Sequence, residues 1–219
     1  MFTGIVEEIG VVRHVDDTAS GRRIEIGAER VLGTLAVGDS IAVAGECLTV
    51  VARDDRSFSV DTVPESLART TLGRVARGSH VDLERAATPV TSLGGQVVQG
   101  HVDTTTTLRK RAPLGDGARL RFALPKPLAR YVVEKGFIAL DGVSLTVAAV
   151  AKTTFDVALV ARTAQATTLG SLREGDPVNV EVDVIAKYVE RSLEVYRSIS
   201  SSQRRTARRA SSAASRSTS

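Results

Sequence analysis

The sequence contains no tryptophan, a single cysteine and few aromatic residues, which make up 4% of its 219 residues. This composition excludes a large aromatic core, and the plentiful valine, threonine and glycine favour many short strands joined by turns. Cys47 cannot form a disulfide within the chain, and a lone thiol is typical of a reducing compartment. The chain also lacks the roughly 20 uninterrupted apolar residues of a membrane helix and the pattern of a signal peptide. We therefore expect a soluble, cytoplasmic protein without membrane contact.

Motifs for nucleotide and metal chemistry are absent as well. The sequence has no glycine-rich phosphate loop of the P-loop or dinucleotide type, and no GxSxG motif of a hydrolase nucleophile. One cysteine and three scattered histidines supply no ligand pair with the spacing of a zinc site. The sequence therefore predicts neither nucleotide hydrolysis nor a metal centre.

The formal net charge of +4 comes from the end of the chain. The last 17 residues contain five arginines and no acid, and subtracting these five charges from +4 leaves −1 for the rest. Residues 200–219 hold no sizeable apolar residue, so they cannot bury enough surface to offset the entropy lost on ordering. We expect a disordered Ser/Arg-rich tail there. A basic arm that binds RNA or another polyanion is the alternative, although nothing in the rest of the chain favours a nucleic-acid partner.

The chain repeats itself with a period of 97 residues over most of its length, which indicates two related domains. The openings FTGIVEE and VQGHVDT also match, with one residue of slippage. We place the two domains at residues 1–96 and 97–183. The matching blocks are Gly45 to Val50 with Gly142 to Val147, Ser57 to Val63 with Thr154 to Val160, and Thr70 to Glu84 with Thr167 to Glu181.

Within each half, short alternating runs are interrupted by Gly, Asp and Pro, a pattern typical of a closed antiparallel barrel. We therefore predict an all-β fold. After Val182 the apolar spacing changes to three or four, which predicts a helix at 184–199 with Asp183 at its N-cap. Its apolar stripe packs either on a barrel or against copies of the chain. The stripe consists of Ile185, Tyr188, Val189, Ser192, Tyr196 and Ile199.

Small polar residues occupy matched positions of the repeat. Since side chains alternate across a strand, Cys47 and Thr49 share one face of their strand, and Ser144 and Thr146 share the equivalent face of the second. Each half thus presents a nucleophilic or hydrogen-bonding pair. Cys and Thr also fill strands without any chemical role, but their occurrence at matched positions favours a site.

Two further residues are candidates for ligand contact. His101 lies in QGHVD, next to a glycine that allows a ligand to approach the backbone. Lys135 opens the turn KGF, from which an ammonium group can donate to a carbonyl or an anion. A structural histidine and a surface lysine are the alternatives.

Over about residues 1–197, the sequence closely resembles the riboflavin synthase family. The resemblance rests on MFTGIVEEIG, GECLTV, SVDTVPESLARTTLG, LGGQVVQGHVD, KGFIALDGVSLTV and AKYVER. It implies two six-stranded Greek-key barrels and a C-terminal helix through which three chains associate as a homotrimer. The resemblance also suggests lumazine synthase as a further partner.

The family reaction is a dismutation of two 6,7-dimethyl-8-ribityllumazine molecules. A four-carbon unit moves from one molecule to the other and yields riboflavin and 5-amino-6-(D-ribitylamino)uracil, without cofactor or metal. In the family, the N-terminal barrel of one subunit faces the C-terminal barrel of a neighbour. The ligand contacts implied in the first half are Gly4, Ile5, Val6, Cys47, Leu48, Thr49, Asp61, Thr62, Val63, Pro64, Glu65 and Ser66. Those implied in the second half are Gly100, His101, Val102, Lys135, Ser144, Leu145, Thr146, Ala158, Leu159, Val160, Ala161, Arg162 and Thr163.

The resemblance also suggests roles for these residues. Our hypothesis is that Ser144, Thr146 and His101 assist removal of a proton from the acidic methyl group of one molecule. Cys47 and Thr49 then serve the partner molecule, by addition to its ring or by positioning a water molecule that adds. Asp183 is a further candidate for polar assistance, and Phe2 helps to close the first pocket.

The chain departs from the family pattern at several positions, among them Thr104 to Thr107, which lack the usual glycine. Gln96 stands where the family commonly has His, and Glu46 replaces a small or apolar residue before Cys47. Ala161 and Arg162 replace the Pro and polar residue expected after the LV strand. The alternative function is that of a non-catalytic lumazine- or flavin-binding antenna protein. Such relatives tend to have lost the polar residues of the second pocket, which this chain retains.

Overall fold

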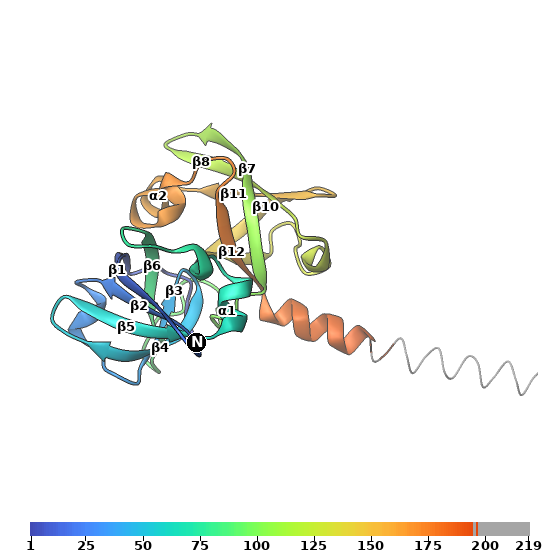
Figure 1. Ribbon diagram of the computed structural model, residues 1–219. Coiled ribbons are helices and arrows are strands. Elements are labelled where there is room, and N and C mark those ends of the chain that lie inside the picture. Colours follow the sequence, from blue (N-terminus) through green and yellow to red (C-terminus); the bar gives the residue numbers. More distant parts are fainter. Residues whose placement is uncertain (195, 197–219) are drawn as a thin grey trace, which may run out of the picture. The chain divides into compact units, whose positions relative to one another are not determined.

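The computed structural model describes residues 1–194 and 196 (Figure 1). Residues 1–183 form one compact unit, and the chain from Val184 onward belongs to a second. The described strands form two closed antiparallel barrels of six strands each, both within the first unit. The all-β prediction of two tandem six-stranded barrels is therefore confirmed.

The first barrel has the strand order β1-β2-β5-β4-β3-β6. Short helical segments connect its strands. The strands are β1 Glu8–Thr18, β2 Gly21–Gly27, β3 Ser40–Val43, β4 Glu46–Arg53, β5 Ser57–Thr62 and β6 His80–Arg85; the helical segments are η1 Val31–Gly33, α1 Pro64–Arg69 and η2 Thr71–Arg74.

The second barrel repeats this connectivity. Its closed order β10-β11-β8-β7-β12-β9 corresponds strand by strand to that of the first barrel. The strands are β7 Thr104–Leu114, β8 Gly117–Ala123, β9 Phe137–Leu140, β10 Val143–Val150, β11 Thr154–Leu159 and β12 Pro177–Val182; the helical segments are η3 Lys126–Leu128, α2 Ala161–Ala166 and η4 Thr168–Ser171.

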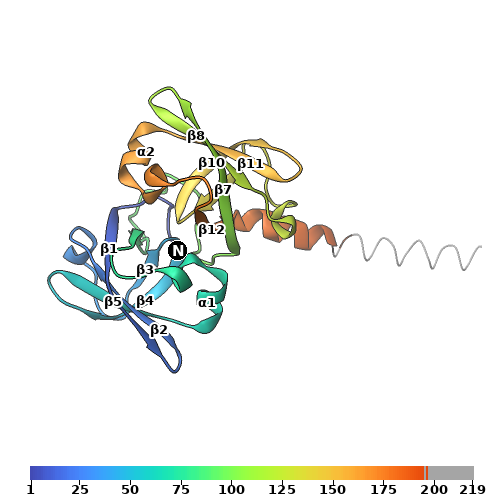
Figure 2. The same cartoon turned by 45° about the horizontal axis from the view of Figure 1, so that its top comes forward.

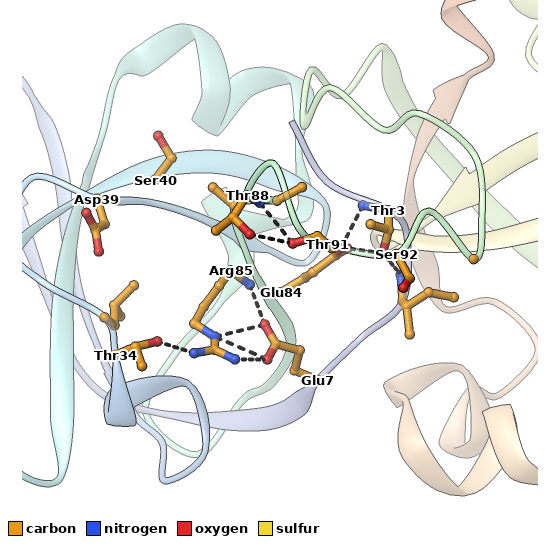
Figure 3. Close-up of a pocket in the computed structure, with 15 residues that line it drawn as sticks. Thr3, Glu7, Thr34, Asp39, Ser40, Glu84, Arg85, Thr88, Thr91 and Ser92 are labelled. Atoms are coloured by element: carbon orange, nitrogen blue, oxygen red, sulfur yellow. Dashed lines mark hydrogen bonds and ion pairs between the residues drawn. The ribbon is translucent and has the colours of Figure 1, made fainter.

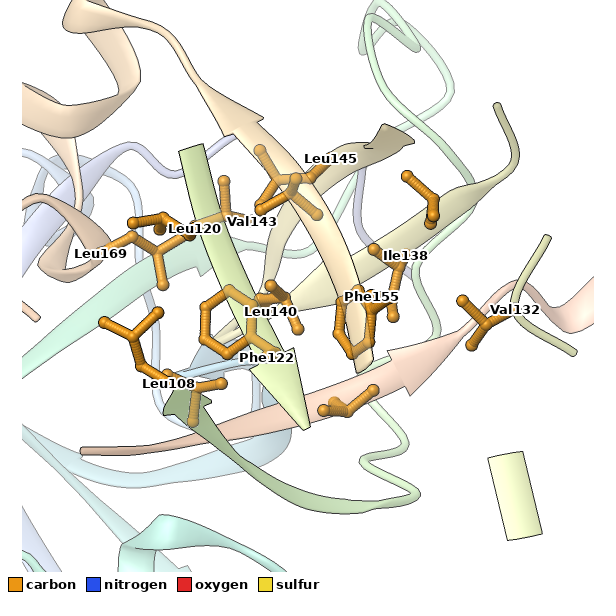
Figure 4. Close-up of a cluster of buried hydrophobic side chains, with 14 of the residues drawn as sticks. Leu108, Leu120, Phe122, Val132, Ile138, Leu140, Val143, Leu145, Phe155 and Leu169 are labelled. Carbon is orange, nitrogen blue, oxygen red and sulfur yellow. The ribbon is translucent and has the colours of Figure 1, made fainter. Parts of the chain in front are cut away.

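Alternation along the strands fills each barrel with aliphatic side chains. On β4, Leu48 and Val50 are buried in the first core, and on β10 Leu145 and Val147 are buried in the second (Figure 4). Burial of one such side chain contributes about 1.5–3 kcal/mol. Phe122 and Phe155 stack inside the second barrel with ring centroids 5.6 Å apart. The residues between these inward-facing positions are consequently left on the outer face.

A third, smaller apolar cluster joins the two barrels. It contains Phe2, Ala42, Val98 and Ala139, and Phe2 is 1% exposed. The backbones of Phe2 and Val98 exchange two hydrogen bonds of 2.7 and 3.0 Å. Figure 2 shows the N-terminus at this border between the barrels. The start of each half is thus held against the start of the other.

Close backbone contact continues this border at Gly45. A Cβ atom on Gly45 would lie 2.5 Å from the backbone nitrogen of Gly142, its repeat partner, and both residues have positive φ (+81° and +85°). A side chain fits neither the space nor the backbone conformation, so glycine is required at both repeat positions.

Buried polar groups cross the same border in a near-symmetrical pattern. Asp82 accepts hydrogen bonds of 2.8 Å from the backbone N–H and the hydroxyl of Thr168. Asn179, the repeat partner of Asp82, accepts one of 2.7 Å from the backbone N–H of Thr71 and donates one of 2.7 Å to the carbonyl of Ala44. Burial raises the pKa of Asp82 to about 7, although the bonds from Thr168 lower it. The first barrel therefore places a titratable acid where the second has a neutral amide.

The second unit begins with a helix at residues 184–194, directly after Asp183. Its apolar side chains are exposed: Ile185 is 63% exposed, Tyr188 71% and Tyr196 70%. The predicted helix is thus present over its described part, whereas Ile199 and the expected tail at 200–219 lie outside the described residues. Among the described helices, none has the length and apolar character needed to span a membrane.

Candidate functional site

The matched polar pairs lie on the outer faces of the two barrels. Cys47 is partly exposed and Thr49 exposed, and Ser144 and Thr146 repeat these exposures. Backbone pairing with β3 and β9 fixes both strands in register. The prediction that each pair shares one face of its strand agrees with these exposures, and the structure places that face on the outside of the barrel.

A loop from the second half lies against Cys47. The backbone N–H of Cys47 donates a hydrogen bond of 2.8 Å to the carbonyl oxygen of Gly100. A Cβ atom on Gly100 would stand only 2.5 Å from the Cβ of Cys47, and the φ of Gly100 is +79°. Glycine is therefore needed for the loop Gly100–Val102 to approach β4.

The loop at the N-terminus makes the same contact with the other barrel. The backbone N–H of Ser144 donates a hydrogen bond of 2.8 Å to the carbonyl oxygen of Gly4. The φ of Gly4 is +75°, and a Cβ atom there would overlap with Ser144. We refer to Cys47, Thr49 and residues 100–102 as the Cys47 half-site, and to Ser144, Thr146 and residues 4–6 as the Ser144 half-site.

Each loop is anchored by a glutamate on the last strand of its own barrel. Glu84 on β6 accepts from the backbone N–H groups of Thr3 (2.6 Å) and Gly4 (3.0 Å) and from the hydroxyl of Thr3. Glu181 on β12, the repeat partner of Glu84, accepts from the N–H groups of Gln99, Gly100 and His101 at 2.7, 3.0 and 3.1 Å. Each glutamate thus fixes a glycine turn that presents its carbonyl to the opposite barrel.

This exchange corrects the sequence interpretation, which assigned each loop to its own half. The 4–6 loop lies beside Ser144 and the 100–102 loop beside Cys47, because the loops cross the border between the barrels. Consequently the hypothesis that groups His101 with Ser144 and Thr146 does not match the contacts. His101 lies in the loop that contacts Cys47 and lowers the pKa of Glu46 through its charge.

Gln96 lies beside Ser144. Its backbone N–H donates a hydrogen bond of 3.3 Å to the Ser144 hydroxyl oxygen. The Gln96 residue is 6% exposed, and its side-chain Oε1 and Nε2 have no hydrogen-bond partner within residues 1–194 and 196. An unsatisfied buried amide costs about 1–3 kcal/mol, so this departure from the family pattern leaves the chain less stable than an apolar side chain would.

Glu46 connects the parts of the Cys47 half-site. The hydroxyl of Ser66 on α1 donates a hydrogen bond of 2.7 Å to Glu46 Oε1, and the backbone amide of Val102 lies near the carboxylate. Burial raises the pKa of Glu46, while these two contacts and the attraction of His101 lower it in part. One carboxylate therefore contacts both the loop and α1.

The implied ligand segment Asp61–Ser66 has mixed orientations. Asp61 forms an ion pair of 2.7 Å with Arg23, which lowers the pKa of Asp61. Thr62 is buried and its hydroxyl donates to a backbone carbonyl. Val63, Pro64 and Glu65 are exposed, and Ser66 is bound to Glu46. Asp61, Val63, Pro64 and Glu65 are thus the exposed residues of this segment, whereas Thr62 is buried.

Several implied contacts have their side chains inside the barrels. Leu48, Leu145 and Leu159 belong to the buried cores, so these positions can reach a ligand only through backbone groups. In the remaining part of the second segment, Ala158, Val160 and Arg162 are exposed, whereas Ala161 and Thr163 are partly exposed.

The other predicted residues occupy distinct places. Lys135 is exposed in a turn with φ +65°, where its backbone N–H donates to Val147. Asp183 directly precedes the C-terminal helix, which is the N-cap position. Phe2 is buried at the border of the barrels, with its ring close to Gly100, rather than lining an open pocket.

A cavity of about 910 Å³ adjoins the Ser144 half-site through Thr3, Ile5 and Gly94. Its walls come from the first barrel and the segment after β6, and Figure 3 shows the Glu7–Arg85 ion pair at its side. The cavity is lined by neither Cys47 nor Ser144. The paired half-sites therefore remain the better candidate for chemistry.

Comparisons with known proteins agree with this duplicated site. The family model described as "Lumazine binding domain" matches twice, at residues 3–86 and 99–183. The chain is 47% identical over 197 residues to the riboflavin synthase of Mycobacterium tuberculosis, covering 88% of this chain and 98% of that protein. It is 43% identical over 198 residues to the riboflavin synthase of Schizosaccharomyces pombe, covering 90% and 95%.

The chain belongs to the riboflavin synthase family. It is therefore an enzyme, and the resemblance found in the sequence motifs is confirmed. Solved structures of LumP share the fold. The complexes with 6,7-dimethyl-8-(1'-D-ribityl) lumazine and with riboflavin have TM-scores of 0.76 and 0.78, at 23% and 24% identity, covering 83% of this chain and 99% of each LumP chain.

Some residues of this riboflavin synthase family site were missed in the sequence. Glu84 and Glu181 were not considered, although they are the last residues of a matched pair of repeat blocks. Glu46 was noted only as a departure from the pattern. The two glutamates occupy equivalent positions of the 97-residue repeat, and this match was the signal in the sequence that could have indicated a shared anchoring role.

Proposed function

We propose that this chain is a riboflavin synthase that transfers a four-carbon unit between two 6,7-dimethyl-8-ribityllumazine molecules. The products are riboflavin and 5-amino-6-(D-ribitylamino)uracil. The observation that supports this best is the pair of half-sites with equivalent backbone geometry, each having a glycine-turn carbonyl bound to its strand at 2.8 Å. Two identical reactants require two such similar binding surfaces.

The two surfaces must hold their ligands in contact. Orientation of both reactants makes a bimolecular step effectively unimolecular, which can lower the barrier by roughly 7–11 kcal/mol. We propose that the Cys47 half-site of one subunit faces the Ser144 half-site of a neighbour in a homotrimer. The exposed apolar side chains Ile185, Tyr188 and Tyr196 support association of the chains through the C-terminal helix.

Unlike side chains on matching backbones favour unlike chemistry. Ser144 and Thr146 assist removal of a proton from the methyl group of the ligand in their half-site. His101 and Cys47 act on the other molecule, Cys47 by addition to its ring or by positioning water, because the 100–102 loop lies against β4.

Three further residues have supporting roles. Lys135 donates to a ligand carbonyl, for which its exposure is suitable. Asp183 supplies polar assistance at the start of the helix, and Phe2 supports the Gly100 turn at the border of the barrels.

The direct test is incubation of the pure protein with 6,7-dimethyl-8-ribityllumazine. We expect one riboflavin for every two lumazine molecules consumed, together with one equivalent of the pyrimidine product, without added cofactor. Binding and fluorescence of lumazine without any riboflavin formation would instead identify a non-catalytic antenna protein.

A further inference from the structure

Glu46 has no counterpart in the second half of the chain. Its repeat partner is Val143, which is 3% exposed and packs in the core of the second barrel. Glu46 occupies the same register at the start of β4, but its side chain is partly exposed. The side chain of a valine can accept no hydrogen bond, so the second half-site has no equivalent of the Glu46 carboxylate.

The carboxylate of Glu46 holds two separate segments. Ser66 of α1 donates its hydroxyl proton to Glu46 Oε1 at 2.7 Å, and the backbone amide of Val102 lies near the same carboxylate and lowers its pKa. Because Cys47 also donates its N–H to Gly100 at 2.8 Å, the 100–102 loop contacts β4 at its first residue through a hydrogen bond and at its last through Glu46. His101 is the residue between these two attachments.

Charge makes these attachments strong. Hydrogen bonds to an ionised carboxylate are shorter and roughly twice as strong as neutral ones. The loop is also held by Glu181, which accepts from the N–H groups of Gln99, Gly100 and His101, and by the N–H of Asp103, which donates a hydrogen bond of 2.9 Å to the carbonyl of Val180. Glu46 adds a contact at Val102, between these attachments.

We propose that Glu46 is a positioning residue that fixes His101 and α1 around the Cys47 half-site and thereby sets the ligand affinity of that half-site alone. The inference rests on the proposed function, since it assumes that the Cys47 half-site binds a lumazine or flavin. Glu46 acts through the loop and the helix rather than by contact with the reacting atoms.

The test compares Glu46→Val, which copies the repeat partner, with Glu46→Gln, which keeps one accepting oxygen. Glu29→Gln, at an exposed position, is the control. Titration with riboflavin should show that Glu46→Val weakens one of two binding affinities about tenfold and leaves the other unchanged. Glu46→Gln should recover part of this loss. In steady-state turnover of lumazine, KM should rise and kcat should fall in both variants, more in Glu46→Val than in Glu46→Gln.

A merely structural role would lower the amount of folded protein without changing either affinity. Equal weakening of both sites, or no weakening, would overturn the proposal. Hydrogen exchange supplies a readout without ligand: the Val102 amide should exchange about tenfold faster in Glu46→Val, while the Gly100 amide, which is bound to Glu181, should be unchanged. Absence of turnover in the unmodified protein would refute the proposed function, but a faster Val102 exchange would still support the positioning role.

Discussion

The two half-sites share their backbone and differ in their side chains. In both, the carbonyl of a glycine with positive φ accepts a 2.8 Å hydrogen bond from the backbone N–H of a residue whose side chain lies on the outside of the barrel. In both, a glutamate on the last strand of the barrel anchors the loop that contains this glycine. Cys47 corresponds to Ser144, and Glu46 to Val143. Because the shared part is main chain, divergence of the side chains leaves the shape of both surfaces intact. The same ligand can then be held twice and treated differently.

The largest expected effect follows from removal of one functional group at a time. Ser144→Ala and Cys47→Ala should each lower kcat about 100-fold, the typical contribution of a positioned acid, base or nucleophile. Lumazine affinity should change less than about threefold, because the backbone contacts remain. Steady-state turnover and equilibrium binding measure the two quantities. An equal loss of affinity and turnover would indicate structural damage instead.

The shared backbone can be broken at Gly100. Gly100→Ala should lower the free energy of unfolding by about 3 kcal/mol, because the new Cβ overlaps with Cys47 and the residue has φ +79°. Gly38→Ala is the matched control, since Gly38 has φ +95° but no atom near the position of the Cβ, and should cost about 1 kcal/mol. Urea unfolding measures both. Equal losses in the free energy of unfolding for the two variants would show that the loop moves to accommodate the new Cβ atom.

The comparison extends to the border of the barrels through Asp82 and its partner Asn179. Since burial raises the folded pKa of Asp82 to about 7 from an ordinary 3.8, the folded state retains a proton that the unfolded chain releases. The stability that this proton provides is complete below about pH 4 and is lost as pH rises through 7. Asp82→Asn should therefore add about 2 kcal/mol at pH 8 and nothing at pH 4.

Burial also raises the pKa of Asp141, and the charge of Asp82 raises it further. Asp82→Asn therefore also removes the repulsion between these two carboxylates. Thermal unfolding between pH 4 and pH 8 checks this expectation. A stability difference that does not depend on pH would mean that Asp82 is ionised throughout.

The smallest expected effect concerns Gln96 beside Ser144. Gln96→Leu should stabilise the protein by about 1 kcal/mol, because it removes a buried amide whose oxygen and nitrogen find no partner in the described part of the chain. Its backbone bond to Ser144 should persist. Denaturant unfolding gives the sign, and a loss of stability would imply that ordered water satisfies the amide.

The sequence was sufficient for the barrels and for the polar pairs. Strand periodicity of two determines which residues face outward, so Thr49 and Thr146 could be placed from the pattern alone. The 97-residue repeat likewise indicated equal connectivity in both halves. These features are local or internal to each half, which is why one sequence reveals them.

The exchange of the loops could not be predicted. Contact of Gly4 with Ser144 and of Gly100 with Cys47 depends on how one barrel packs on the other, and periodicity carries no information about that packing. The match of the openings at a spacing of 96 rather than 97 was the sole local irregularity noted there, and it does not reveal a partner. Glu46 appeared as a departure from a pattern, and its role became visible only with Ser66 and Val102 beside it.

The most direct measurement is an equilibrium titration of the assembled protein with 6,7-dimethyl-8-ribityllumazine that counts bound molecules per chain. Two binding sites of unequal affinity on each chain are the predicted result, since each chain carries one Cys47 half-site and one Ser144 half-site. Saturation at one molecule per chain would contradict the account.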